Sequence, residues 1–90
     1  MPNQELDLRV IPHPQRHPLV FSAFDALKVG ESFILVNDHD PHPLRMQMDF
    51  MRHGQLSWEY LERGPVDFRV EIKRIKEAPQ KKEKAAQETA

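Results

Sequence analysis

The chain has 90 residues, a formal net charge of −1 with histidine neutral, and no cysteine. One domain is expected, because a single hydrophobic core rarely divides below about 100 residues. The balanced charge provides no field to draw nucleic acid or an anionic membrane, and the lack of cysteine excludes disulfides, iron–sulfur clusters, thiolate metal sites and a cysteine nucleophile.

The first predicted element is a half-buried strand over residues 5–10, in which apolar and charged residues alternate. Three prolines follow within residues 11–18, too many for a regular element. A helix is then predicted to begin at Pro18, because the missing N–H of proline is harmless in a first turn. Apolar residues recur at helical spacing after it, and Gly30 is expected to end the helix.

The continuous apolar run of residues 33–36 predicts a deeply buried central strand. Residues 44–53 fit the periodicity of either a strand or a helix. A helix is favoured, because Asp40 suits its cap, Pro41 suits its first turn and Gly54 suits its end.

Residues 56–60 and 68–72 alternate between apolar and polar side chains around Gly64-Pro65, which predicts a β-hairpin. The predicted order β-α-β-α-β-β packs most simply as a two-layer α/β sandwich, a four-stranded mixed sheet with both helices on one face. The domain is expected to span residues 1–75. Residues 76–90 are charged and lack a recurring apolar residue, so they are predicted to be a disordered tail or a frayed helix without a binding role.

Carboxylates and imidazoles cluster just after the predicted central strand, and further imidazoles precede the first predicted helix. Both loops are expected to leave the sheet at one edge, the carboxyl ends of the first two strands. Nitrogen and oxygen ligands suit a divalent transition metal such as Zn, Cu, Ni or non-haem Fe, and His39 or His17 could be an axial ligand of haem. The candidate metal ligands are His13, His17, Asp38, His39, Asp40 and His42.

The same cluster also permits structural interpretations. Asp40 can cap the helix, Asp38 can brace the turn and His39 can bind the backbone. His17 can satisfy a buried carbonyl group. As a third alternative, His39 lies between two carboxylates and could act as a general base.

Short blocks along the chain carry a family resemblance: Leu6-Asp7-Leu8-Arg9, Arg16-His17-Pro18-Leu19-Val20-Phe21, Leu27-Lys28-Val29-Gly30-Glu31, Asn37-Asp38-His39-Asp40-Pro41, Pro43-Leu44, Trp58-Glu59-Tyr60 and Gly64-Pro65. On these blocks the chain resembles an uncharacterised bacterial and archaeal family, number 2249 among the domains of unknown function, over residues 5 to about 75. The resemblance implies a SirA/TusA-like fold, which is the fold of a class of sulfur carriers.

The sulfur carriers place a Cys-Pro pair after a Leu-Asp-x-Arg signature, whereas this chain has His13-Pro14 at that position. An imidazole cannot carry a persulfide, so the chain is not expected to be a sulfur carrier. Members similar to this family occur beside hemerythrin-like and other redox-associated domains. The resemblance therefore implies respiratory or nitrogen-oxide physiology and a redox protein as a partner.

The function expected from the sequence is a small accessory module that binds a metal, haem or a redox partner. The alternative is a protein-interaction adaptor in which the histidine cluster is structural; an enzyme is less favoured, because no activated nucleophile is evident. A cytoplasmic location is expected, because residues 1–5 lack the features of a signal peptide and no apolar run approaches the roughly 20 residues of a membrane-spanning helix.

Overall fold

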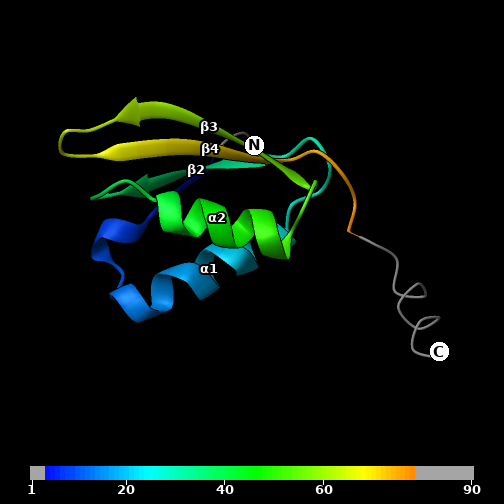
Figure 1. The fold of residues 1–90 in the computed structure, drawn as a ribbon, viewed down its shortest axis with the longest axis horizontal. Helices are drawn as coiled ribbons and strands as arrows, with labels where there is room; N and C mark the ends of the chain where they lie inside the picture. Colours follow the sequence, from blue (N-terminus) through cyan, green and yellow to red (C-terminus); the bar gives the residue numbers. More distant parts are fainter. Residues whose placement is uncertain (1–3, 79–90) are drawn as a thin grey trace.

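The structure is a computed structural model, and it describes residues 4–78. The predicted order of helices and strands is confirmed (Figure 1). Most of the predicted tail, residues 79–90, lies outside the described residues. The elements are β1 (Gln4–Asp7), a short 3-10 helix (Leu8–Val10), α1 (His13–Asp25), β2 (Ser32–Asn37), α2 (His42–Met51), β3 (Leu56–Arg63) and β4 (Phe68–Arg74).

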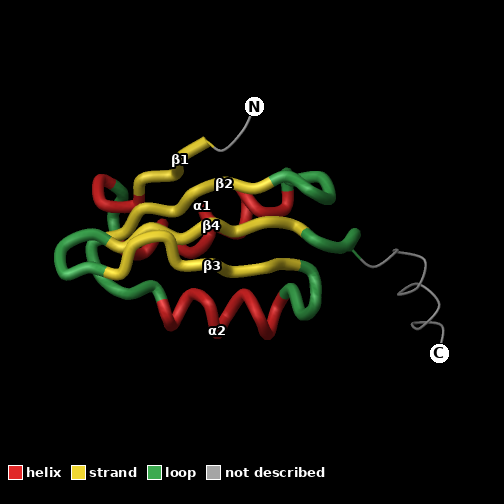
Figure 2. Tube along the Cα trace, turned by 90° about the horizontal axis from the view of Figure 1, so that it is seen from above, coloured by secondary structure: helices red, strands yellow, loops and turns green. Residues whose placement is uncertain are grey.

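The four strands form one mixed sheet in the order β1-β2-β4-β3. β1 and β2 are parallel, and the other two pairs are antiparallel. Both helices lie against the same face of this sheet (Figure 1), and Figure 2 views the opposite face, on which the described residues place no helix. The predicted two-layer sandwich is therefore confirmed, and α1 makes the crossover that a parallel strand pair requires.

The hydrophobic core lies between the sheet and the helices. β2 and β4 direct alternate side chains toward the helices, and α1 contributes Val20 and Phe24, which are one turn apart. Burial of one such side chain contributes about 1.5–3 kcal/mol, so the core holds both helices on the sheet. The fully buried side chains of this core are Leu8, Val20, Phe24, Leu35, Met48, Val70 and Ile72.

The first strand is shorter than predicted. β1 ends at Asp7, whose carboxylate accepts a hydrogen bond from the backbone N–H of Arg9 at 2.9 Å and so caps the 3-10 helix. Val10, which was expected to face the core, is 77% exposed. The alternation of apolar residues in the sequence extends beyond the true end of the strand. The strand ends earlier because the Asp7 side chain caps the 3-10 helix that follows.

The helix boundaries predicted for α1 were wrong at both ends. The helix begins at His13 within the proline-rich stretch, and Pro14 lies in its first turn, where no N–H is needed. Pro18 lies inside the helix and removes only one backbone hydrogen bond. The helix ends at Asp25, and Gly30 belongs to the turn before β2, where it adopts a φ of 93°.

The helix favoured for residues 44–53 and the β-hairpin are confirmed as α2 and the β3–β4 pair. The cap of α2 was predicted incorrectly, because Pro41 occupies the N-cap position and no side chain bonds there. In the hairpin turn, Gly64 has a φ of 83°, and a Cβ at this position would lie 2.9 Å from the ring of Phe68. Among the described residues, no helix has the length and apolar character needed to cross a membrane.

Candidate functional site

The first residues after β1 and after β2 meet at one edge of the sheet, as predicted. The two strands are parallel with Asp7 beside Val36, so the segments that follow them leave in the same direction. The rings of His13 and His39, one from each segment, are stacked with their centroids 5.8 Å apart. We call this region the histidine edge and define it by His13, Arg16, Asp38 and His39.

Arg16 holds the histidine edge together from inside the protein. Its side chain is 7% exposed, and it donates hydrogen bonds to the carbonyl oxygen of Ile11 at 2.8 Å, to Oδ1 of Asn37 at 3.1 Å and to Oδ1 of Asp38 at 3.2 Å. A buried guanidinium is stable only when its donors are paired in this way. Arg16 therefore ties the start of α1 to the end of β2.

Asp38 and His39 form a hydrogen-bonded pair at the surface. Nδ1 of His39 lies 2.8 Å from Oδ1 of Asp38. The hydrogen bonds from His39 and from Arg16 lower the pKa of Asp38 to about 2, so its carboxylate is ionised near neutral pH. An ionised carboxylate only accepts hydrogen bonds, so Nδ1 of His39 carries the hydrogen and, in the neutral ring, Nε2 has a free lone pair.

His17 makes its hydrogen bond to α2 and not to the stacked pair. Its Nδ1 atom lies 2.7 Å from Oε1 of Gln47, a hydrogen bond that links the two helices. The His17 ring also lines a small cavity of about 60 Å³ beside His13, Arg16 and His39. A cavity of this size holds about two water molecules and is far too small for a porphyrin.

The remaining two predicted ligands are Asp40 and His42. Oδ1 of Asp40 accepts a hydrogen bond from the hydroxyl of Tyr60 at 2.6 Å, which ties the start of α2 to β3. His42 is exposed in the first turn of α2. Within residues 4–78, no group of three or more histidine, aspartate or glutamate side chains is arranged to hold a metal ion. Metal binding by the predicted ligands therefore stays a prediction.

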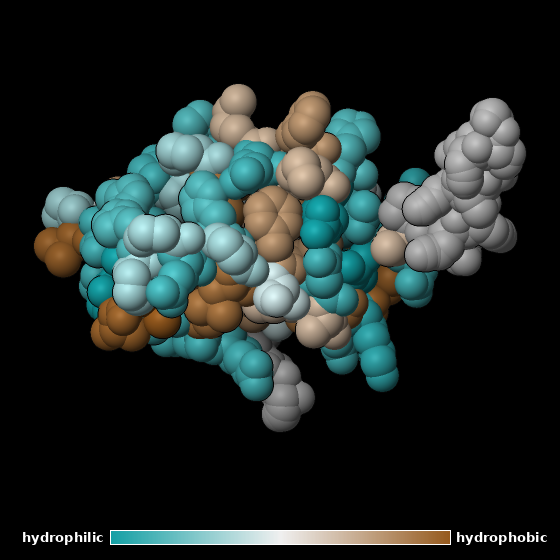
Figure 3. Space-filling view, turned by 90° about the horizontal axis from the view of Figure 1, so that it is seen from below, coloured by the Kyte–Doolittle hydropathy of each residue, from teal (hydrophilic) through white to brown (hydrophobic). Residues whose placement is uncertain are grey.

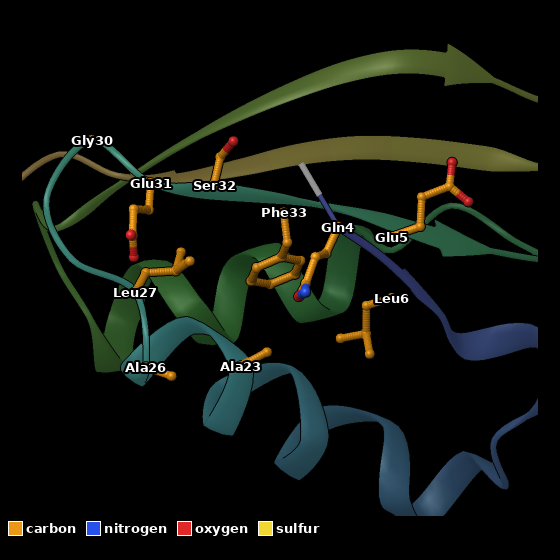
Figure 4. Close-up of a pocket in the computed structure, with 10 residues that line it drawn as sticks. All are labelled: Gln4, Glu5, Leu6, Ala23, Ala26, Leu27, Gly30, Glu31, Ser32 and Phe33. Carbon is orange, nitrogen blue, oxygen red and sulfur yellow. The ribbon is translucent and has the colours of Figure 1, made fainter. Parts of the chain in front are cut away.

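A larger cavity of about 650 Å³ lies under β1, beside the carboxyl end of α1 (Figure 4). None of the ten described residues that line it is a histidine, and the charged ones among these ten are Glu5 and Glu31. It lies at the opposite end of the β1–β2 pair from the histidine edge, as the position of Gly30 and Ser32 at the start of β2 shows.

The residues predicted for the site did not include Arg16, and they also omitted Asn37 and Tyr60, which support it. Asn37 was not assigned a role, although it is the first polar residue after the buried apolar run, a position at which a side chain often meets other buried polar groups. Tyr60 was given no role beyond its place in the predicted hairpin, and its hydroxyl donates a hydrogen bond to Asp40. Its partner depends on how the hairpin lies beside α2, which no local pattern indicates.

A family model with the description "Uncharacterized conserved protein (DUF2249)" matches residues 5–74, and the chain belongs to this family. The assignment made from the short sequence blocks is therefore confirmed. No curated protein and no solved structure matches the chain. The similarity in fold to the sulfur carriers stays a prediction.

Proposed function

We propose that this member of the DUF2249 family is a small cytoplasmic accessory module that binds a divalent transition metal ion through His39 and His13. One observation carries the proposal: Nδ1 of His39 is hydrogen-bonded to the ionised carboxylate of Asp38, so the lone pair of the neutral ring is on Nε2, where it could bind a metal ion. Metal-binding histidines commonly donate their second N–H to a carboxylate in this way, which fixes the ring and its tautomer. The cysteine-free sequence supports the cytoplasmic location.

His13 supplies the second ligand in this proposal. A metal ion lies about 2.0–2.1 Å from each ligand nitrogen, so two rings with centroids 5.8 Å apart must tilt toward each other to share it. His13 is exposed in the first turn of α1, so its ring turns without disturbing the core. Two imidazoles suit Zn, Cu, Ni or Fe and leave further positions on the ion for water or a partner.

A bare metal ion fits the histidine edge better than haem does. The cavity beside the stacked rings is about 60 Å³ and cannot enclose a porphyrin. The open positions on an ion held by two histidines would be completed by a redox protein, for which a hemerythrin-like protein is a candidate from the family resemblance. This partner would place the module in respiratory or nitrogen-oxide metabolism.

The test is calorimetric titration of the chelator-treated chain with Zn²⁺ and Cu²⁺, together with the metal content of the protein as purified. We expect near-stoichiometric binding that His39→Ala abolishes and that Asp38→Asn weakens about 10-fold to 100-fold. His53→Ala is the matched control, because His53 is also exposed but follows the far end of α2. Unchanged affinity in His39→Ala, or no binding by the native chain, would refute the proposal.

A protein-interaction adaptor is the second candidate function. The observation that favours it is that Asp38 and Asp40 are both engaged in internal hydrogen bonds, with Arg16 and with Tyr60. These bonds are what a purely structural role of the cluster requires. If the chain is an adaptor, His39→Ala leaves partner capture unchanged and the native chain binds neither metal ion.

A further inference from the structure

β1 ends the sheet on one side and leaves a backbone edge for a partner. Among residues 4–78 it pairs only with β2. Alternate residues of an edge strand direct their N–H and C=O groups away from the sheet, where another strand can bind them. The helix side of the molecule also exposes hydrophobic side chains (Figure 3), but a helix makes its backbone hydrogen bonds internally. The edge of β1 therefore suits a partner in an extended conformation.

The cavity of about 650 Å³ lies beside this edge, on the helix side of β1. Gln4 and Leu6 direct their side chains toward α1 (Figure 4), and the small side chains of Ala23 and Ala26 on α1 do not fill the space between them. Gln4 and Ala26 are exposed, whereas Phe33 is 5% exposed, so the cavity opens to solvent and extends to the core. Its volume exceeds that of any one side chain, so it can receive more than one.

The other face of β1 is acidic. Glu5 and Asp7 lie on this face, because successive side chains of a strand alternate, and Figure 4 shows Glu5 pointing away from α1. Two arginines near this face each pair with two carboxylates. The ion pairs are Arg9 with Asp7 and Asp67, and Arg69 with Glu5 and Glu62. One guanidinium group neutralises one carboxylate, so these ion-paired groups keep a net negative charge, which attracts a basic partner.

We infer that the edge of β1 binds an extended peptide segment of another protein, in which lysine or arginine alternates with aliphatic residues. The peptide extends the sheet by one strand through backbone hydrogen bonds to β1. Its aliphatic side chains enter the cavity, and its basic side chains lie beside Glu5 and Asp7 on the opposite face. The cavity is at the opposite end of the β1–β2 pair from the histidine edge, so the inference does not depend on the metal site.

A second copy of this chain fits the edge less well than a basic strand does. Residues directly opposite each other in an antiparallel pair lie on the same face of the sheet. If two β1 strands paired with the helices of both copies on one side, Glu5 would therefore lie opposite Glu5 or Asp7 of the other copy. Like charges placed directly opposite destabilise such a pair.

The test is a nuclear magnetic resonance titration of the full chain, with chelator, using the capped peptide Lys-Val-Lys-Leu-Lys-Val-Lys. We expect saturation at one peptide per chain with a dissociation constant on the order of 100 µM, because the four residues of β1 offer a short contact. The amide shifts should change along β1 and at Ala23, and not along β3, which is the other edge of the sheet. A peptide with glutamate in place of each lysine should bind about 10-fold more weakly.

N-methylated peptides test whether the backbone of the peptide pairs with β1. Alternate N–H groups of a strand point to opposite edges, so methylation of only the lysine N–H groups and of only the aliphatic N–H groups should differ. One of these two peptides should lose binding by about 10-fold or more, and the other should retain it. Undiminished binding of both peptides would show that strand addition does not occur.

Substitutions in the chain test the cavity and the charge separately. Ala23→Leu fills the cavity and should weaken binding about 10-fold, whereas Ser22→Leu, exposed on the same helix and outside the cavity, is the matched control. Glu5→Lys should weaken binding of the lysine peptide and strengthen binding of the glutamate peptide, and Glu59→Lys, exposed on β3, is its control. Circular dichroism checks that each variant folds.

The Glu5→Lys comparison decides the question even if Ala23→Leu does not fold. The inference is overturned if the native chain does not bind the lysine peptide, if the shift changes lie along β3, or if a folded Ala23→Leu chain binds as tightly as the native one. It is also overturned if Glu5→Lys leaves the preference between the two peptides unchanged.

Discussion

Two buried arginines lie at opposite ends of the sandwich, and their surroundings differ. Arg16 is 6% exposed beside the end of β2, and Arg74 is 5% exposed at the end of β4, where its backbone bonds Gly30 and Glu31 before β2 begins. Arg16 donates to a carboxylate, an amide and a carbonyl oxygen. Arg74 donates to the Gln55 side chain and to backbone carbonyls, and its Nε has no partner among the described residues.

The difference shows what an ion pair adds to a buried arginine. At the Arg74 end, the cation lies over the ring of Phe24, 4.4 Å from its centroid, and fills the end of the core. At the Arg16 end, the same residue type orients Asp38, which in turn orients an exposed imidazole. Both arginines pack at an end of the core. Arg16 also fixes the position of Asp38, and Asp38 fixes the exposed ring of His39.

The largest effect is expected from Arg16→Met. This change leaves the Ile11 carbonyl and the buried Asn37 side-chain oxygen without the Arg16 donor, whereas Asp38 keeps its hydrogen bond with His39, so the cost is about 1–3 kcal/mol in the free energy of unfolding. Urea denaturation measures this cost, and metal titration should show weaker binding at His39. If Arg16→Met lowers the free energy of unfolding by less than about 1 kcal/mol, the hydrogen bonds of Arg16 contribute no more to stability than those of Arg74.

A smaller effect is expected from Arg74→Met. The described residues bond no carboxylate to Arg74, and methionine also packs well against the Phe24 ring, so the free energy of unfolding should change by about 1 kcal/mol or less in either direction. The same urea denaturation tests it. Equal losses in Arg16→Met and Arg74→Met would show that the carboxylate at the histidine edge adds nothing.

The smallest effect is expected from Asp7→Asn, which tests the end of β1 through the pH dependence of stability. Hydrogen bonds from the Arg9 side chain and backbone lower the pKa of Asp7 from 3.8 to about 2. Because the folded-state pKa is depressed, the ionised carboxylate stabilises the fold above about pH 4, and this contribution is lost as the pH falls toward 2. Asp7 is 36% exposed at its side chain, so the contribution is below about 1 kcal/mol.

The readout for Asp7 is the difference in melting temperature between the native chain and Asp7→Asn. It should favour the native chain at pH 6 and shrink as the pH is lowered from 4 to 2. A difference that stays constant over this interval would mean that the Asp7 charge does not stabilise the turn that leads into α1.

The fold could be predicted from the sequence where periodicity and burial agree. Residues 33–36 and the hairpin are examples, because their apolar patterns match the faces that the sheet buries. The start of α1 could not be predicted in this way, because three prolines in eight residues argue against a helix. The helix forms there because Pro14 lies in the first turn and Pro18 removes only one backbone hydrogen bond. Local residue preference therefore misplaced a boundary but not the order of the elements.

At the candidate site, the meeting of the two loops could be predicted, because parallel strands end at the same edge. The partners of the individual side chains could not. Asp40 has the residue type and spacing of a helix cap, yet it bonds Tyr60, 20 residues further along the chain. The burial of Arg16 likewise depends on contacts with β2, whose last residue, Asn37, lies 21 residues further along the chain.

Gly64 restricts the substitutions that members of this family can carry in the hairpin turn. Asparagine or aspartate can adopt the positive φ of Gly64. These residues would also fit at Gly30 and Gly54, where a Cβ would have open space. The Phe68 ring blocks that route at position 64. We therefore expect the two positions to be inherited together: a family member with a side chain at the position of Gly64 should also carry a residue smaller than phenylalanine at the position of Phe68.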